Sequence, residues 1–420
     1  MSRFLFATLG SLGDLHPYIA VARALVASGQ QAVIATAADY REPVEGAGVE
    51  FAAVGPSMES FGDYRTVITR LFNGRNGPEF LMRVLVMPHL RAVYDDLERA
   101  AAGADLLVSH PLALTLPLLA QKTGKPWVST VLAPLSLMSN YDPPVIDGAP
   151  WLRHLRLLGP GFYGALFGLL KRGVRRWEAP LHEFRAGLGL PPTDRMAMFE
   201  GQFSPLKNLA LFDAPLAQPQ PDWPPNTVVC GSPMFDGAAA ALPGDVAQFL
   251  DAGEAPVVFA LGSSAVWIAG DFWKHAAAAA QQLGRRAMLV TGPEQPRDLP
   301  DGVRAFPYLP YSQVFPRAAA IVHQAGIGTL AQALRAGRPQ LIVPVAFDQP
   351  DNARRAQALG LARALPFRSV TARRLEAELG ALLLNADYAV AANTVATGLA
   401  QTDPAACAAE ELMACLRSRS

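Results

Sequence analysis

Residues 321–352 have the sequence IVHQAGIGTLAQALRAGRPQLIVPVAFDQPDN, and the alternation of strand and helix is clearest there. A short apolar run ends in His323, a glycine-rich turn follows, and an alanine-rich segment with helical spacing comes after the turn. A second apolar run then leads to Asp348 and Gln349. Apolar runs joined by a crossover helix are typical of parallel sheets. The stretch therefore predicts a strand-helix-strand unit with polar residues after each strand.

The same alternation continues through most of the chain, which predicts an α/β fold. We expect strands over residues 4–9, 32–36, 106–109, 128–132, 257–261, 287–290, 321–322 and 340–343. We expect helices over residues 17–28, 80–102, 113–124, 271–283, 329–336, 349–359 and 403–417. The prediction for the first helix starts at Pro17 because proline is favoured in a first helical turn.

The length of 420 residues and a proline-rich interruption predict two domains. Prolines crowd residues 217–226, which can continue neither a central strand nor a helix interior. We expect a first domain over residues 1–216, a linker over 217–240, a second domain over 241–402 and a C-terminal helix over 403–420. Both domains are predicted to be doubly wound and Rossmann-like, facing each other across a cleft lined by the carboxyl ends of their strands.

The composition excludes several classes of protein. Lysine plus arginine and aspartate plus glutamate both number 36, so no net positive charge attracts nucleic acid. A hydrophobic fraction of 51% excludes a disordered chain. Three cysteines without a CxxC pair fit a reducing compartment, and no apolar run is long enough for a signal peptide or a membrane span. We therefore expect a cytoplasmic protein.

The glycine-rich turn is a candidate anion site. A helix N-terminus presents unpaired N–H groups and a partial positive charge, and Gly326, Gly328 and Thr329 stand where that helix begins. Asp348 and Gln349 supply acceptors and an amide that suit a polyhydroxylated ligand, although they could also cap the helix that follows. The turn therefore predicts a site for a phosphorylated, hydroxyl-rich compound.

The order His-x-x-Gly-x-Gly-Thr, then Gly337-Arg-Pro and Asp348-Gln349, resembles the nucleotide-sugar glycosyltransferases of the UDP-glycosyltransferase superfamily. Bacterial members of that superfamily carry His-x-Gly-Gly-x-Gly-Thr, Gly-x-Pro and Asp-Gln, and the resemblance covers nearly the whole chain. It implies a GT-B fold, an inverting glycosyltransferase and no bound metal. No set of His, Cys, Asp or Glu has metal-ligand spacing in the sequence.

The resemblance also implies roles for individual residues on the donor side. His323 and the turn would bind the diphosphate, Asp348 and Gln349 the sugar hydroxyls, and the Tyr308-Leu309 pair the nucleobase. Gln332 stands where plant members place a glutamate on the ribose, so a dTDP-sugar and a UDP-sugar both remain open. The donor-binding residues implied are Gly13, Ser263, Tyr308, Leu309, His323, Gly326, Ile327, Gly328, Thr329, Gln332, Asp348 and Gln349.

The turn GSLGDLH over residues 10–16 holds the candidate catalytic base. An acceptor hydroxyl needs a positioned base, and Asp14 occupies the place where sterol and lipid branches of the superfamily have Gly-Asp. His16 competes for that role or orients Asp14, and both could instead serve as helix caps. His110 follows a predicted strand and either lines the acceptor side or fills space before Pro111.

The acceptor is expected to be hydrophobic. Residues 151–177 contain six lysines or arginines and no acidic residue, with apolar residues at helical spacing. Such a segment lies on an anionic membrane surface, lines a channel for a fatty substrate, or packs as an ordinary helix with a basic face. Peripheral association of the protein with a membrane is therefore one of the expectations for this segment.

Several scattered motifs resemble the rhamnosyltransferases of rhamnolipid synthesis. That resemblance implies transfer of a hexose, with dTDP-rhamnose as a candidate donor, to a hydroxy fatty acid lipid. Two alternatives stay open: a nucleotide-sugar epimerase of the same fold, and a nucleotide- or lipid-binding module without catalysis.

Overall fold

The computed structural model describes residues 1–237 and 242–417, which form two compact units. The first unit holds Met1–Phe235 together with the C-terminal segment from Asp403, and the second holds Asp236–Thr402. The boundary between the units lies inside the stretch predicted as a linker, part of which (residues 238–241) is outside the described residues. No helix within 1–237 and 242–417 combines the length and the apolar character that a membrane crossing requires.

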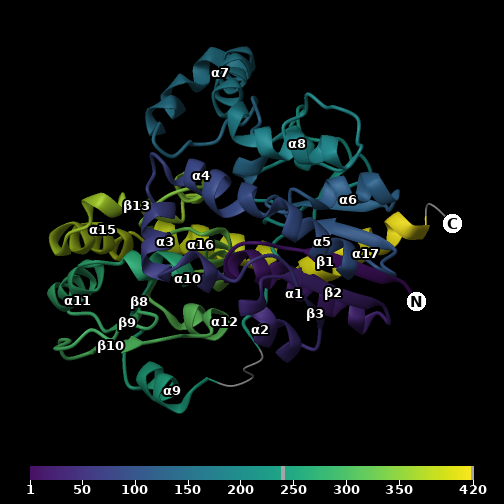
Figure 1. Ribbon diagram of the computed structural model, residues 1–420. Coiled ribbons are helices and arrows are strands. Elements are labelled where there is room, and N and C mark those ends of the chain that lie inside the picture. Colours follow the sequence, from purple (N-terminus) through teal and green to yellow (C-terminus); the bar gives the residue numbers. More distant parts are fainter. Residues whose placement is uncertain (238–241, 418–420) are drawn as a thin grey trace. The chain divides into compact units, whose positions relative to one another are not determined.

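The first unit is built on a parallel sheet of seven strands in the order β3-β2-β1-β4-β5-β6-β7, of which β1, β2 and β3 are labelled in Figure 1. Its strands are β1 (Arg3–Ala7), β2 (Gln31–Thr36), β3 (Glu50–Ala53), β4 (Leu106–Ser109), β5 (Trp127–Val131), β6 (Asn208–Ala210) and β7 (Thr227–Val229). The strand order reverses between β1 and β4, so the loops after these two strands flank the point where ligands bind in open α/β sheets.

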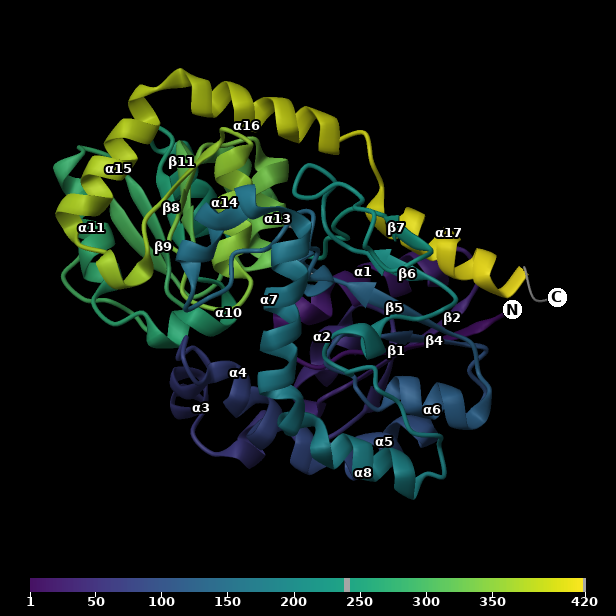
Figure 2. The same cartoon turned by 90° about the horizontal axis from the view of Figure 1, so that it is seen from above.

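Helices surround this sheet, and the C-terminal helix returns to it. They are α1 (Leu12–Ala27), α2 (Arg41–Gly46), α3 (Tyr64–Leu71), α4 (Gly77–Phe80), α5 (Leu90–Ala100), α6 (Leu116–Thr123), α7 (Gly159–Val174), α8 (Ala179–Gly187) and α17 (Pro404–Arg417). Helix α17 packs against α1, the helix that follows the first strand (Figure 2). The segment predicted as a C-terminal helix thus belongs to the first unit.

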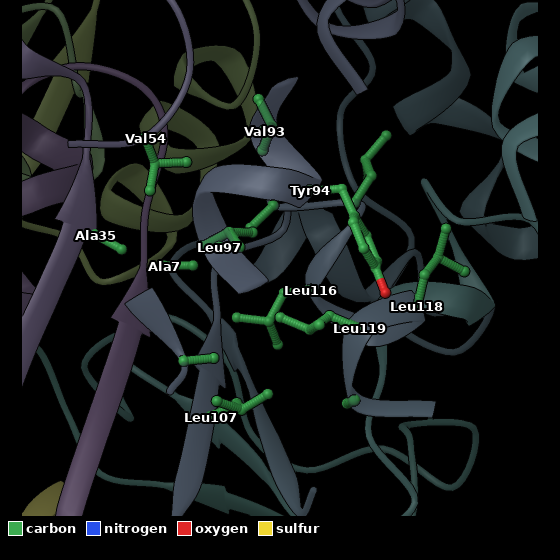
Figure 3. Close-up of a cluster of buried hydrophobic side chains, with 14 of the residues drawn as sticks. Ala7, Ala35, Val54, Val93, Tyr94, Leu97, Leu107, Leu116, Leu118 and Leu119 are labelled. Atoms are coloured by element: carbon green, nitrogen blue, oxygen red, sulfur yellow. The ribbon is translucent and has the colours of Figure 1, made fainter. Parts of the chain in front are cut away.

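The core of the first unit lies between the sheet and its helices. Leu107 on β4 and Ala7 on β1 point toward Leu97 of α5 and Leu116 of α6 (Figure 3), and all four are at most 2% exposed. The central strands β1 and β4 are mostly apolar because helices cover both faces of a parallel sheet. This packing supports β1 and β4, whose ends carry the candidate base and its neighbour.

The second unit repeats the arrangement with six parallel strands in the order β10-β9-β8-β11-β12-β13. In Figure 2 its sheet lies between α11 and α15 on one side and α13 and α14 on the other. The strands are β8 (Val257–Ala260), β9 (Ala287–Val290), β10 (Val303–Phe306), β11 (Ala320–His323), β12 (Gln340–Ile342) and β13 (Ala362–Ala364). The helices are α9 (Gly244–Asp251), α10 (Gly262–Ala265), α11 (Phe272–Gln282), α12 (Tyr311–Val314), α13 (Ile327–Ala336), α14 (Gln349–Ala358), α15 (Ala372–Leu384) and α16 (Ala386–Leu399).

Three local expectations were wrong. Helix α1 begins at Leu12, so Pro17 lies inside the helix; hydrogen bonds between Ser11 and Asp14 start the helix earlier. The helix expected over residues 80–102 is interrupted by a π-helical and a 3₁₀ stretch near Pro88, because proline cannot donate an intrahelical hydrogen bond. The predicted linker contains β7, an edge strand that pairs with β6 where the prolines end.

Candidate active site

The carboxylate of Asp14 is held at the first turn of α1. The Ser11 N–H and hydroxyl both donate to Asp14 Oδ2, at 2.7 and 3.0 Å. Gly10 has a φ of +141°, and a Cβ atom at that position would lie 2.4 Å from the same oxygen. Glycine is therefore required here, because a side chain would displace the carboxylate. Gly13, predicted in the donor set, lies half-buried in the same turn.

His110 lies against the other oxygen of Asp14. Strands β1 and β4 pair with Ala7 opposite Ser109, which brings the two loops together. His110 Nε2 is 3.4 Å from Asp14 Oδ1, and Nδ1 accepts a hydrogen bond from the Leu112 N–H at 3.1 Å. Because Nδ1 accepts this bond, Nε2 carries a proton that faces the carboxylate. His110 is 4% exposed, whereas the Asp14 side chain is 33% exposed and can meet a substrate.

The surroundings keep Asp14 ionised. Burial raises the pKa of Asp14, but the hydrogen bond and charge of His110 and the Ser11 donors lower it further, so the net pKa lies below its ordinary value. A carboxylate that is ionised and accessible at neutral pH can accept a proton from an acceptor hydroxyl.

His16 has a different neighbour. Its ring packs edge-on against Phe235, with centroids 5.6 Å apart. The structure brings His110 into a pair with Asp14. Behind His110 lies Tyr18, whose ring contacts the imidazole edge-on and whose hydroxyl bonds to Thr130.

In the second unit, the turn before α13 lies at the carboxyl ends of three adjacent strands. His323 at the end of β11 pairs with Ala260 of β8 and Ile342 of β12. Gly326 caps α13, which places Ile327, Gly328 and Thr329 in its first turn, all partly exposed. Ser263 is exposed in α10, the short helix that follows β8. The free N–H groups of the α13 turn can therefore receive an anion.

Gln324 joins the two glycine loops. Its side chain is 6% exposed, and Cβ atoms built on Gly262 and Gly326 would lie 2.2 and 2.8 Å from its Nε2. Both glycines therefore make room for this amide. Its Oε1 has no hydrogen-bond partner among the residues the structure describes.

His323 is fully buried, and both its ring nitrogens have protein partners. Nδ1 accepts the Ala325 N–H at 3.1 Å, and Nε2 donates to Gln340 Oε1 at 3.0 Å. Burial lowers the pKa of His323 to about 4, so the ring is neutral at physiological pH. These bonds shape the turn around Ala325, which has a φ of +65°. Direct contact of His323 with a diphosphate stays a prediction.

The buried imidazole predicts a pH-dependent stability. Its pKa in the folded protein, about 4, lies below the ordinary 6.5, so the unfolded chain binds the proton first as the pH falls. The stabilisation by the neutral ring is fully present above pH 6.5 and is lost as the pH falls toward 4. Lowering the pH from 7 to 5 should therefore reduce the free energy of unfolding by about 2 kcal/mol. Denaturant unfolding at these two pH values measures the loss, and His323→Gln should reduce it. An unchanged pH dependence in the variant would contradict this explanation.

Asp348 and Gln349 begin α14 beside the same turn. Asn352 Nδ2 donates to Asp348 Oδ2 at 2.7 Å and to the Ala325 carbonyl at 2.9 Å, which ties the two loops together. Gln349 Oε1 accepts the Val345 N–H at 2.8 Å, and Asp348 is partly exposed. Asp348 thus has the access that contact with a sugar hydroxyl requires.

Tyr308 and Gln332 meet at Asp236, a residue that sequence reasoning missed. The Tyr308 ring is 55% exposed, and its hydroxyl donates to the Asp236 carbonyl at 2.8 Å. Gln332 donates to the Asp236 carboxylate, which also accepts the Ser312 N–H at 2.8 Å. An exposed aromatic ring beside fixed polar groups suits a nucleoside. Leu309 is buried and supports the loop.

Gln324 and Asn352 were also missed, although both carry a sequence signal. Gln324 follows His323 directly, and Asn352 stands one helical turn after Asp348. Asp236 lies in a turn that has no spacing rule relative to Gln332, so only the fold reveals their contact. Within residues 1–237 and 242–417, no three His, Cys, Asp or Glu side chains gather as around a metal ion.

Two doubly wound units, each with a parallel sheet covered by helices, are the architecture of the GT-B transferases of nucleotide sugars. Residues 289–414 match the model of the family described as erythromycin biosynthesis protein CIII-like, C-terminal domain. The O-mycaminosyltylonolide 6-deoxyallosyltransferase of Streptomyces fradiae is 32% identical over 407 residues, which cover 95% of this chain and 94% of that protein.

Solved structures show the same fold. The glycotransferase of kitacinnamycin superposes with a TM-score of 0.73 at 19% identity, covering 99% of this chain and 98% of its own. The glycosyltransferase VinC, in complex with dTDP, gives 0.69 at 22% identity, covering 99% and 100%. The chain belongs to the nucleotide-sugar-dependent glycosyltransferases of the GT-B superfamily, and it is an enzyme.

Proposed function

We propose that this enzyme transfers a 6-deoxyhexose from a dTDP-sugar, with inversion, to a hydroxyl of a hydrophobic acceptor. The observation that carries the proposal is the Asp14 carboxylate, which is one-third exposed and held by Ser11 and His110. The Streptomyces fradiae relative is named for transfer of a 6-deoxyallosyl group, and VinC was solved with dTDP. Rhamnose is also a 6-deoxyhexose, so dTDP-rhamnose is the first donor to test.

In the proposed reaction, the acceptor oxygen attacks the anomeric carbon while Asp14 accepts the hydroxyl proton. The bond from that carbon to the diphosphate oxygen breaks, and the nucleotide diphosphate leaves with the bonding electrons. Attack from the side opposite to the leaving group inverts the configuration. Removal of the proton by a positioned base contributes about 10²- to 10⁴-fold to the rate.

The leaving diphosphate is proposed to bind at the N-terminal turn of α13. The N–H groups from Ile327 to Thr329 and the helix dipole stabilise the added negative charge without a mobile cation. His323 holds the preceding turn through its bond to the Ala325 N–H, and in this proposal it acts mainly by positioning those amides. Tyr308 would stack on the base, with Gln332 and Asp236 near the ribose.

Two classes of hydrophobic alcohol are candidate acceptors. The Streptomyces fradiae relative is named for a sugar-bearing tylonolide acceptor, which favours a hydroxylated macrocycle. A hydroxy fatty acid lipid is the other class, and it rests on the sequence motifs alone.

The test uses purified enzyme with dTDP-rhamnose, dTDP-glucose, UDP-glucose and UDP-rhamnose. Each donor is combined with a hydroxylated macrolactone or a hydroxy fatty acid lipid, and products are identified by mass spectrometry and by the anomeric configuration. A glycosylated acceptor with inverted configuration supports the proposal. Conversion of the donor sugar without any acceptor would instead indicate an epimerase, and binding without turnover would indicate a binding module.

His110 predicts a shift in the pH profile. Asp14 must be ionised to act as the base, and its pKa is lowered. As the pH falls, kcat/KM should therefore decrease only at pH values below the ordinary pKa of an aspartate. Replacing His110 with Phe removes the hydrogen bond and the charge and leaves burial, which raises the pKa, so the acid limb should move to higher pH. We expect a loss of about tenfold in kcat, less than the 10²- to 10⁴-fold that a positioned base contributes, because the Asp14 carboxylate itself is retained.

His110→Gln is the matched variant, because its amide can still donate to Asp14. It should restore part of both the rate and the original pH limb. If His110→Phe lowers activity equally at every pH, His110 has only a packing role.

A further inference from the structure

The 3₁₀ helix Pro150–Leu158, helix α7 and the 3₁₀ helix Arg175–Glu178 form a continuous segment that no step of the transfer reaction uses. We propose that this segment, called the anchor segment below, docks the enzyme on an anionic lipid bilayer. The proposal concerns where the enzyme works and is independent of the donor and acceptor argued above.

The anchor segment exposes large apolar side chains. Trp151 is 59% exposed, Leu157 98%, and Leu158 and Leu169 are 56% and 63% exposed. Side chains three residues apart line up along a 3₁₀ helix, so Trp151 and Leu157, six apart, project from the same edge. Exposed apolar groups of this size concentrated in about twenty residues mark an interaction surface.

The segment is fixed from its inner side. Tyr163 and Phe167 of α7 are each 2% exposed, and their ring centroids are 5.7 Å apart. The Tyr163 hydroxyl donates to the Leu152 carbonyl at 2.6 Å, which joins α7 to the 3₁₀ helix. The outer apolar residues are therefore presented on a supported scaffold, and they do not belong to the buried core.

The charge of the segment selects an anionic partner. Lys171 pairs with Glu200 and Arg156 with Asp142, whereas Arg172, Arg175 and Arg176 are exposed and have no ion pair in the described part of the chain. The rest of the chain balances this charge, since the protein has no net charge. The attraction is therefore local to the anchor segment.

Exposed apolar side chains and the arginines lie close together at the end of the anchor segment. Leu169 and Arg172 stand at i and i+3, so they share one face of the end of α7, and Arg175 and Arg176 follow directly in the 3₁₀ helix Arg175–Glu178. A bilayer interface accepts Trp and Leu without requiring a matching pocket, while lipid phosphates pair with arginines. The combination of protruding apolar groups and unpaired arginines therefore fits an anionic membrane better than a shaped protein partner.

The experiment is co-sedimentation of the full-length protein with vesicles. Vesicles of phosphatidylcholine alone are compared with vesicles that also contain phosphatidylglycerol, at low and high salt. We expect binding to the anionic vesicles to be at least tenfold stronger, because each basic residue near the surface contributes about fivefold. High salt should weaken binding by screening the arginines.

Four exposed positions test the anchor segment without touching the core. Leu157→Glu with Leu169→Glu, and separately Arg172→Glu with Arg176→Glu, should each lower vesicle binding by about tenfold or more. Leu384→Glu and Arg373→Glu on α15 are matched controls, since both residues are exposed, and they should bind like the wild type. Trp151 should add a blue shift of fluorescence on binding, which Trp151→Phe removes.

Three results would overturn the proposal. The first is equal binding of the wild type to neutral and anionic vesicles, or no binding to either. The second is unchanged binding by both anchor variants. The third is a concentration-dependent dimer in analytical ultracentrifugation that Leu157→Glu dissociates, which would assign the anchor segment to a second copy of the chain.

Discussion

Asp14→Asn is expected to lower kcat by at least about 100-fold, the lower end of what a positioned base contributes. Asparagine has nearly the same shape, and its side-chain oxygen can still accept the Ser11 N–H bond that holds the first turn of α1. It cannot accept a proton from the acceptor. The loss should therefore appear in the chemical step rather than in folding or donor binding.

Three measurements separate these possibilities. Single-turnover kinetics report the chemical step, calorimetric titration with dTDP reports donor binding, and thermal unfolding reports the fold. We expect only the first to change strongly. Retention of more than about a tenth of the wild-type rate would remove Asp14 from the role of base.

Thr329→Glu should weaken dTDP binding by at least about 100-fold while the free protein keeps its stability. Thr329 is the third residue of α13, where a glutamate is favourable for the helix because it complements the dipole. The same carboxylate would face the diphosphate, and two like charges about 4 Å apart repel by about 4 kcal/mol near a protein surface. Weaker dTDP binding together with unchanged or higher stability of the free protein would indicate electrostatic repulsion, whereas misfolding would lower both.

Titration calorimetry with dTDP measures the affinity, and thermal unfolding without ligand provides the control. Thr329→Ser keeps the hydroxyl and should bind dTDP nearly as the wild type does. Binding of dTDP by Thr329→Glu at wild-type strength would place the diphosphate elsewhere and would remove the α13 turn from the proposed site.

The central strands of both sheets could be predicted from the sequence. The runs that became β1, β4, β8 and β11 are predominantly apolar because parallel strands are covered on both faces, and their residue types show this directly. The short strands β3, β6, β7, β10 and β13 were missed, because three or four residues carry too little pattern. Helix starts depended on hydrogen bonds such as Ser11 to Asp14, which residue spacing does not show.

The residue types and their order were enough to predict a two-unit α/β chain, the glycine-rich turn before α13 and the carboxylate at the first turn of α1. These features depend on contacts within one or two helical turns, so neighbouring residues specify them. The pairing of Asp14 with His110, the enclosure of His323 by Ala325 and Gln340, and the meeting of Tyr308 and Gln332 at Asp236 emerged only in three dimensions. They depend on which strands lie side by side and on how far loops reach, and these are consequences of packing the whole sheet.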